Sequence, residues 1–146
     1  MNINEHEFYM KKALEQAKIA YDYDEVPVGA IIVYNNKIIA RSHNLCEKLI
    51  DFTAHAEMQV FTSASNYLQS KYLDKCSLYV TLEPCLMCAG AAYLTRVGKI
   101  IFGANDPKRG FRTKSANTLH PKTTIIGPIM EIECIGIIKS FFSDKR

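Results

Sequence analysis

Two short segments that lie far apart in the sequence place the strongest constraint on how this chain can fold. They are His55-Ala56-Glu57 and Pro84-Cys85-Leu86-Met87-Cys88. Zinc in proteins takes thiolate and imidazole ligands in a tetrahedral array, and a catalytic zinc keeps one of the four positions for water. A chain in which His55, Cys85 and Cys88 share one ion must bring both segments to the same place. The pattern therefore predicts one catalytic Zn²⁺ per chain with these three ligands.

The spacing within each segment also suits catalysis. Cys85 and Cys88 are three residues apart at a predicted helix start, so both thiols face one side of the first turn. Free amides and the helix dipole favour thiolates there. Zinc with two thiolates and one neutral imidazole is a weaker Lewis acid than zinc with three imidazoles, so its water needs a nearby base. We assign that role to Glu57, two residues after His55.

The order His-x-Glu, then Pro-Cys-x-x-Cys, is typical of zinc deaminases that act on nucleobases. In this hypothesis Glu57 takes a proton from the zinc-bound water and delivers it to a ring nitrogen. The resulting zinc-bound hydroxide attacks the carbon that carries the exocyclic amine. Glu57 then protonates the amine, which leaves as ammonia.

Two other protein classes remain open from these motifs. A Cys-x-x-Cys pair is also typical of thiol–disulfide oxidoreductases, and stoichiometric zinc without a redox-active disulfide would exclude that class. A non-catalytic zinc module that binds RNA would leave Glu57 without a function, and release of ammonia would exclude it. A structural zinc site is disfavoured, because the sequence has no second Cys-x-x-Cys to complete four ligands.

Composition favours a single deaminase domain over residues 1–146. The chain has 146 residues, of which 48% are hydrophobic and 23% charged, and these values are typical of one globular domain. No apolar run approaches the roughly 20 residues of a membrane span, and residues 1–7 lack the basic and apolar parts of a secretory signal. Five cysteines, an odd number, argue against a disulfide scaffold. We therefore expect a cytoplasmic protein with no membrane association.

Hydrophobic periodicity predicts alternating helices and strands. Helices are expected at 4–22, 53–69, 85–96 and 132–142, and strands at 28–34, 37–42, 77–82, 99–103 and 123–130. Asn4 with Glu7 suits a capping box, Asn35-Asn36 suits a hairpin turn, and Pro84 is expected in the first turn of its helix. Residues 44–52 and 104–122 are expected to be loops. The alternation predicts an α/β fold with a mixed sheet flanked by helices.

Residues 53–58 and 79–91, which surround the two metal segments, resemble the bacterial tRNA-specific adenosine deaminases of the cytidine-deaminase superfamily. The resemblance continues at 25–30, 101–104, 133–134 and 140–142, and so spans nearly the whole chain. It implies a three-layer α/β/α fold with a five-stranded sheet, and a homodimer. It also implies conversion of adenosine to inosine at the wobble position of a tRNA anticodon loop.

The resemblance implies a set of substrate contacts by position. They are Val28, Asn44, Ala54, Asp106, Lys108 and Phe142. Asn44 is expected to hydrogen-bond the target nucleotide, whereas Val28 and the Ala54 backbone line the base pocket. Asp106 and Lys108 border the path of the flanking nucleotides, and Phe142 packs against a neighbouring base. From the residues alone, Asn44 suits a turn equally well, and Phe142 suits core or dimer packing.

The sequence departs from the family in two places. Phe52 stands where the family usually has proline, and residues 107–112 replace a small, glycine-rich loop. From 106 to 122 the chain carries Lys108, Arg109, Arg112, Lys114 and Lys122 around Phe111, with Asp106 as the one acid. Basic side chains around an aromatic suit phosphate contacts and base stacking, although an ordinary solvated loop has the same composition.

The main alternative is a deaminase of a free nucleobase or nucleoside, such as guanine, cytosine or cytidine, with an identical zinc site. The net charge of +3 is compatible with an anionic partner. The basic loop, together with Lys139, Lys145 and Arg146 at the end of the chain, favours RNA.

Overall fold

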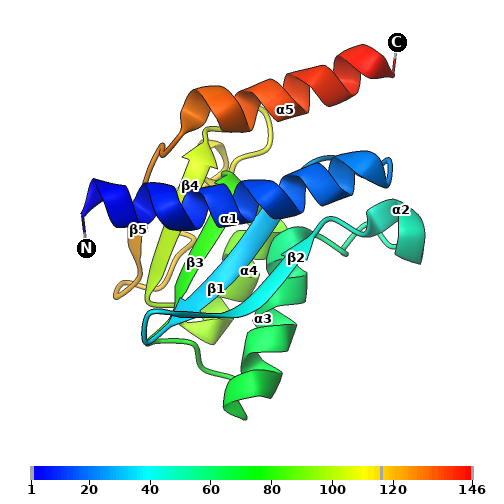
Figure 1. Cartoon of the computed structure of the whole chain (residues 1–146). Coiled ribbons are helices and arrows are strands. Elements are labelled where there is room, and N and C mark those ends of the chain that lie inside the picture. The colour runs from blue at the N-terminus through cyan, green and yellow to red at the C-terminus, as the bar shows by residue number, and fades with distance from the viewer. Residues whose placement is uncertain (1, 116, 146) are drawn as a thin grey trace.

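A mixed sheet forms the centre of the computed structural model, which describes residues 2–115 and 117–145 (Figure 1). Its strands are β1 (Gly29–Tyr34), β2 (Lys37–His43), β3 (Ser77–Leu82), β4 (Lys99–Ala104) and β5 (Thr124–Ile126). In the described ranges they form a five-stranded sheet in the order β2-β1-β3-β4-β5. Strand β1 runs antiparallel to β2 and β3, whereas β3, β4 and β5 are parallel. The predicted mixed sheet is therefore confirmed.

Helices cover both faces of this sheet (Figure 1). They are α1 (Ile3–Asp22), α2 (Cys46–Leu49), α3 (Ala56–Leu68), α4 (Leu86–Thr95) and α5 (Glu131–Asp144). Residues of α1 and α5 pack with Ile31 and Val33 on one face. Residues of α3 and α4 pack with Ala30 and Ile32 on the other. Successive strand residues point to opposite faces, so the apolar run in β1 contributes to two cores, as the three-layer α/β/α prediction requires.

Helix α1 packs unusually close to the sheet at Gly29. A Cβ atom at Gly29 would lie 2.0 Å from the carbonyl oxygen of Ala13 and 2.5 Å from the amide nitrogen of Ala17. No side chain fits at those distances, so only glycine allows this contact between α1 and the start of β1.

Local signals set most element boundaries. Asn35 and Asn36 both adopt left-handed backbone conformations, with φ of 49° and 60°, so the predicted hairpin turn is confirmed. The expected cap of the first helix is wrong by two residues. The side chain of Asn2, rather than Asn4, accepts a hydrogen bond from the Glu5 amide at 3.0 Å.

Three other element predictions need correction. The expected loop at 44–52 contains α2, whose first amides are capped by Glu25 from a distant part of the chain: the amides of Glu47 and Lys48 each donate to its carboxylate at 2.9 Å. Pro84 precedes α4 rather than entering its first turn, because Cys85 is the N-cap residue. The last strand is limited to Thr124–Ile126, since Gly127 and Pro128 follow it.

The connection at 104–122 also contains a 3₁₀ turn, Phe111–Thr113. Across residues 2–115 and 117–145, none of the helices combines the length and the apolar character that crossing a membrane requires. Arg146, which was counted with the basic residues at the end of the chain, lies outside the described residues.

Candidate active site

The two metal-ligand segments meet where α3 and α4 begin. His55 is the N-cap residue of α3 and Cys85 is the N-cap residue of α4, while Cys88 lies in the first turn of α4. His55 Nδ1 lies 3.5 Å from Cys85 Sγ and 3.5 Å from Cys88 Sγ. The three ligand atoms all lie within 4.8 Å of one another. The structure therefore brings together the residues that were expected to share an ion.

These distances fit a tetrahedral zinc site. Bond lengths of about 2.3 Å to sulfur and about 2.0 Å to nitrogen place tetrahedral N and S ligands about 3.5 Å apart. The observed separation of Nδ1 from each sulfur is 3.5 Å. Two soft thiolates and one imidazole are also the donor set that zinc prefers over magnesium or calcium.

Hydrogen bonds among these three groups shift their pKa values in different directions. The Cys88 side chain donates to Cys85, and together with His55 it lowers the pKa of Cys85 to about 4. The same hydrogen bond, followed by burial, raises the pKa of Cys88. Hydrogen bonding to Cys85 raises the pKa of His55. Because a divalent cation needs deprotonated ligands, its binding here would release a proton from the Cys88 thiol.

Glu57 lies beside these ligands inside the protein. It occupies the first turn of α3 and is 4% exposed. Burial raises the pKa of Glu57 to about 7, although His55 and a hydrogen bond with Cys88 act in the opposite direction. A carboxyl group that is buried next to a metal site and close to neutrality can both accept and donate a proton.

Neighbouring backbone and side-chain groups orient the start of α3. The backbone carbonyl of Phe52 accepts a hydrogen bond from the His55 imidazole, which restricts the ring orientation. Asn44 Oδ1 accepts from the Ala56 amide at 2.9 Å, and its Nδ2 donates to the Val26 carbonyl at 3.1 Å. Asn44 thus helps to set the position of His55, and sequence reasoning missed this contact.

The remaining residues expected to contact substrate lie around this end of the sheet. Val28 and Ala54 are buried, and the Ala54 amide and carbonyl already bond with Asp51 and Leu45. Phe142 is 47% exposed. Together with Asn44 it lines a hollow of about 530 Å³ between α2 and the end of α5.

The end of α5 is bound to α1. Lys145 pairs with Asp24, and Asp144 accepts a hydrogen bond from the Tyr21 hydroxyl. Of the basic residues at the end of the chain, Lys145 is therefore already paired. Its charge contributes less to RNA attraction than the sequence suggested.

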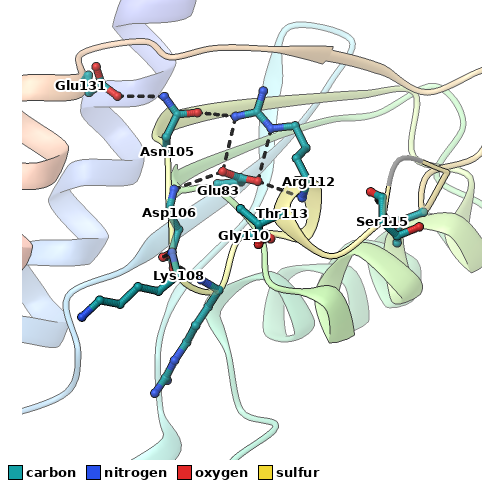
Figure 2. A network of polar contacts seen from close by, with 11 residues as sticks. Glu83, Asn105, Asp106, Lys108, Gly110, Arg112, Thr113, Ser115 and Glu131 are labelled. Carbon is teal, nitrogen blue, oxygen red and sulfur yellow. Dashed lines mark hydrogen bonds and ion pairs between the residues drawn. The ribbon is translucent and has the colours of Figure 1, made fainter.

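Two residues of the loop at 105–113 differ from the roles expected for them in base stacking and phosphate contact. Phe111 is 4% exposed, so its ring is buried and is not available to stack on a base. Arg112 forms an ion pair with Glu83 at 3.3 Å, so its charge is balanced inside the protein although its side chain is 43% exposed. Asp106 Oδ1 accepts from the amides of Lys108 and Arg109 at 3.1 and 3.0 Å, whereas the Lys108 side chain extends away from this network (Figure 2).

Comparison with known proteins gives the family. Residues 4–146 match the sequence model of the MafB19-like deaminases. The chain is 44% identical to the tRNA-specific adenosine deaminase of Bacillus subtilis (strain 168), over 99% of this chain and 92% of that protein. One similar solved structure comes from biochemical and structural studies of A-to-I editing by tRNA:A34 deaminases at the wobble position of transfer RNA. Its TM-score is 0.83 at 40% identity, and the match covers 89% of this chain and 98% of that one.

The fold also occurs in a deaminase with another substrate. The guanine deaminase of Bacillus subtilis has a TM-score of 0.67 at 29% identity, over 98% of this chain and 95% of that one. Architecture therefore does not separate the two activities, whereas sequence identity is higher to the tRNA enzyme. The match to the tRNA-specific adenosine deaminase of Bacillus subtilis spans nearly the full length. It shows that this chain belongs to the tRNA-specific adenosine deaminases, within the MafB19-like deaminase family.

Proposed function

We propose that this protein hydrolyses adenosine to inosine at the wobble position of a tRNA anticodon. The observation that carries the proposal is the group of His55, Cys85 and Cys88 next to the buried carboxyl of Glu57. The 44% identity to a tRNA-specific adenosine deaminase supports the substrate. An anticodon loop also offers an unpaired base, which a deaminase needs because its target atom is inaccessible within a duplex.

In this proposal His55, Cys85 and Cys88 hold one Zn²⁺ per chain. A zinc ion held by them makes a water nucleophilic at neutral pH by lowering its pKa. The 3.5 Å separations of Nδ1 from the two sulfurs support this ligand set. Metal analysis of the purified protein tests it directly, because one zinc per chain is expected and the His55→Ala variant should lose it.

Glu57 moves the protons of the reaction. It accepts a proton from the attacking water and passes it to a ring nitrogen of adenine, so that oxygen adds to the carbon that carries the amine. Glu57 then takes the proton of the newly added hydroxyl and delivers it to that amine, so that the carbon–oxygen double bond forms as the carbon–nitrogen bond breaks and ammonia leaves. Burial of Glu57 beside Cys88 supports this role, because exclusion of water strengthens proton transfer between fixed partners.

The proposed substrate contacts lie around the site. One hydrogen of the Asn44 amide bonds to Val26, and the other can donate to the target nucleotide. Val28 and the Ala54 backbone line the base pocket. Phe142, at the hollow that it shares with Asn44, packs against a neighbouring base. Asp106 and Lys108 border the path of the flanking nucleotides.

We also infer a single cytoplasmic deaminase domain that forms a homodimer. Helix α4 carries exposed apolar side chains, and these are Leu86, Met87, Tyr93 and Leu94. A contiguous apolar surface on a small protein suits burial against a second copy. Light scattering of the purified protein tests the dimer.

The activity is tested by offering the protein bulk tRNA, free nucleosides and free bases in parallel. Inosine should appear in tRNA and, after digestion and mass spectrometry, only at the first anticodon position. Product from guanine, cytosine or cytidine alone would replace the RNA substrate with a small molecule and leave the mechanism in place. Absence of ammonia from every substrate would favour the non-catalytic zinc module or the thiol–disulfide oxidoreductase.

A further inference from the structure

Glu83 is a buried carboxylate between β3 and the metal-ligating Cys85. Its side chain is 3% exposed. It accepts hydrogen bonds from the backbone amides of Asp106 and Arg112, each at 3.1 Å. It also accepts from Arg112 Nε at 3.3 Å and Arg112 Nη2 at 3.4 Å. A buried carboxylate is stable only when it is paired and hydrogen-bonded, and here both groups of donors come from one loop (Figure 2).

Arg112 connects Glu83 to the rest of the fold. Its guanidinium lies over the Phe102 ring at 4.5 Å from the centroid. Arg112 Nη2 also donates to Asn105 Oδ1, and Asn105 Nδ2 donates to Glu131 Oε2 at 3.1 Å. A planar guanidinium can serve these partners together, whereas a lysine ammonium cannot. The network thus runs from the start of α5 through Arg112 to Glu83.

The loop also approaches the metal-ligating turn through its backbone. The Phe111 amide donates to the Pro84 carbonyl at 2.9 Å, and Gly110 forms a β-bridge with Cys85. A Cβ atom at Gly110 would lie 2.3 Å from Cδ of Glu83 and 2.4 Å from its Oε2. A larger residue at Gly110 would therefore have to displace the Glu83 carboxylate.

We propose that Glu83 and Arg112 are positioning residues that hold the 105–113 loop against the Cys85 turn, so that the loop meets the nucleotides flanking the target adenosine. This inference rests on the proposed tRNA substrate. Arg112 already donates through Nε and Nη2 to Glu83 and Asn105, so we assign it to loop placement rather than to a phosphate contact. Lys108 and Arg109, which are exposed, remain available for the RNA.

Salt dependence separates these two roles. Each phosphate contact to a single strand contributes a slope of about 0.7 to the plot of log Kd against log salt concentration. Arg112→Gln should weaken binding of an anticodon stem-loop RNA about tenfold through misplacement of the loop, and its salt slope should equal that of Gly110→Ala, which displaces the same loop without removing a charge. Arg109→Gln removes the same charge from the same loop, and it should lower the slope by about 0.7 if Arg109 contacts one phosphate.

A second variant displaces the Glu83 carboxylate without changing any charge. Gly110→Ala should also weaken RNA binding about tenfold, because the added carbon displaces the carboxylate and with it the loop. Arg112→Lys keeps the positive charge but loses the planar contacts, so its binding should fall between those of the wild type and Arg112→Gln. Zinc content and kcat at saturating RNA should stay within about twofold of wild type, as expected when only uniform binding is lost.

Each outcome decides between specific roles. Unchanged Kd in Arg112→Gln and Gly110→Ala would overturn the inference, as would a salt slope in Arg112→Gln that is lower by about 0.7 than the slope of Gly110→Ala. Loss of zinc and kcat with unchanged Kd would show that the pair supports only the metal ligand. If Arg112→Gln does not fold, Gly110→Ala and Arg112→Lys decide. A wild-type protein that forms inosine in the stem-loop keeps the proposed function whatever the variants do, and one that forms none overturns both.

Discussion

Replacing Glu57 by glutamine removes the proposed proton carrier with the least change in shape. The side chain is 4% exposed and burial raises the pKa of its carboxyl. Glutamine keeps the length and the hydrogen-bonding capacity towards Cys88 but cannot shuttle a proton. Loss of a general acid–base group costs about 10² to 10⁴ in rate, which corresponds to about 3–5 kcal/mol of activation free energy. We therefore expect kcat to fall by that factor.

The fold and the metal should survive this change. A neutral amide avoids the cost of burying a charge, so the melting temperature of Glu57→Gln should equal or exceed that of the wild type. Single-turnover conversion of an anticodon stem-loop RNA, with inosine measured by mass spectrometry, gives the rate of the chemical step. Zinc content and RNA affinity are measured on the same preparation. Glu15→Gln, on the exposed side of α1, is the matched control and should react at the wild-type rate.

One result would refute the proposed role of Glu57. If Glu57→Gln retains one zinc per chain and converts RNA within about tenfold of the wild-type rate, no proton carrier has been removed. The proton would then travel through solvent or another group. Loss of zinc together with activity would instead assign Glu57 to the stability of the metal site.

Three further predictions concern the scaffold. Burial lowers the pKa of His6, so the unfolded chain binds this proton more readily than the folded protein does. The stability present above about pH 6.5 is therefore lost as the pH falls. His6→Phe should flatten the acid side of a plot of melting temperature against pH. Gly29→Ala places a carbon 2.0 Å from the Ala13 carbonyl oxygen, and chemical denaturation should show a loss of about 1–3 kcal/mol; an unchanged midpoint would show that α1 moves away freely. Glu25→Ala removes the acceptor for two amides of α2, so the free energy of unfolding should fall by about 1–2 kcal/mol, and less in Glu25→Gln.

Local pattern predicted most of the elements of this protein. The alternation of apolar side chains identifies both faces of β1, and the left-handed preference of Asn35-Asn36 determines the hairpin. The ligand types and their spacing predicted which three side chains converge, because thiolates three residues apart at a helix start share one face. Each of these inferences rests on residue type and spacing and not on a contact seen in the structure.

Tertiary contacts decided which loop residues are paired, buried or free to bind a ligand. The charge of Arg112 favoured a phosphate contact, but Arg112 pairs with Glu83, which is 29 residues away in the sequence. Phe111 looked like a stacking platform but is buried. Helix α2 has no side-chain cap of its own and forms where Glu25, 22 residues from Glu47, receives its amides. Hydrophobic period and ligand chemistry are properties of short segments, whereas the partner of a charge depends on which distant segments the fold brings within hydrogen-bonding distance.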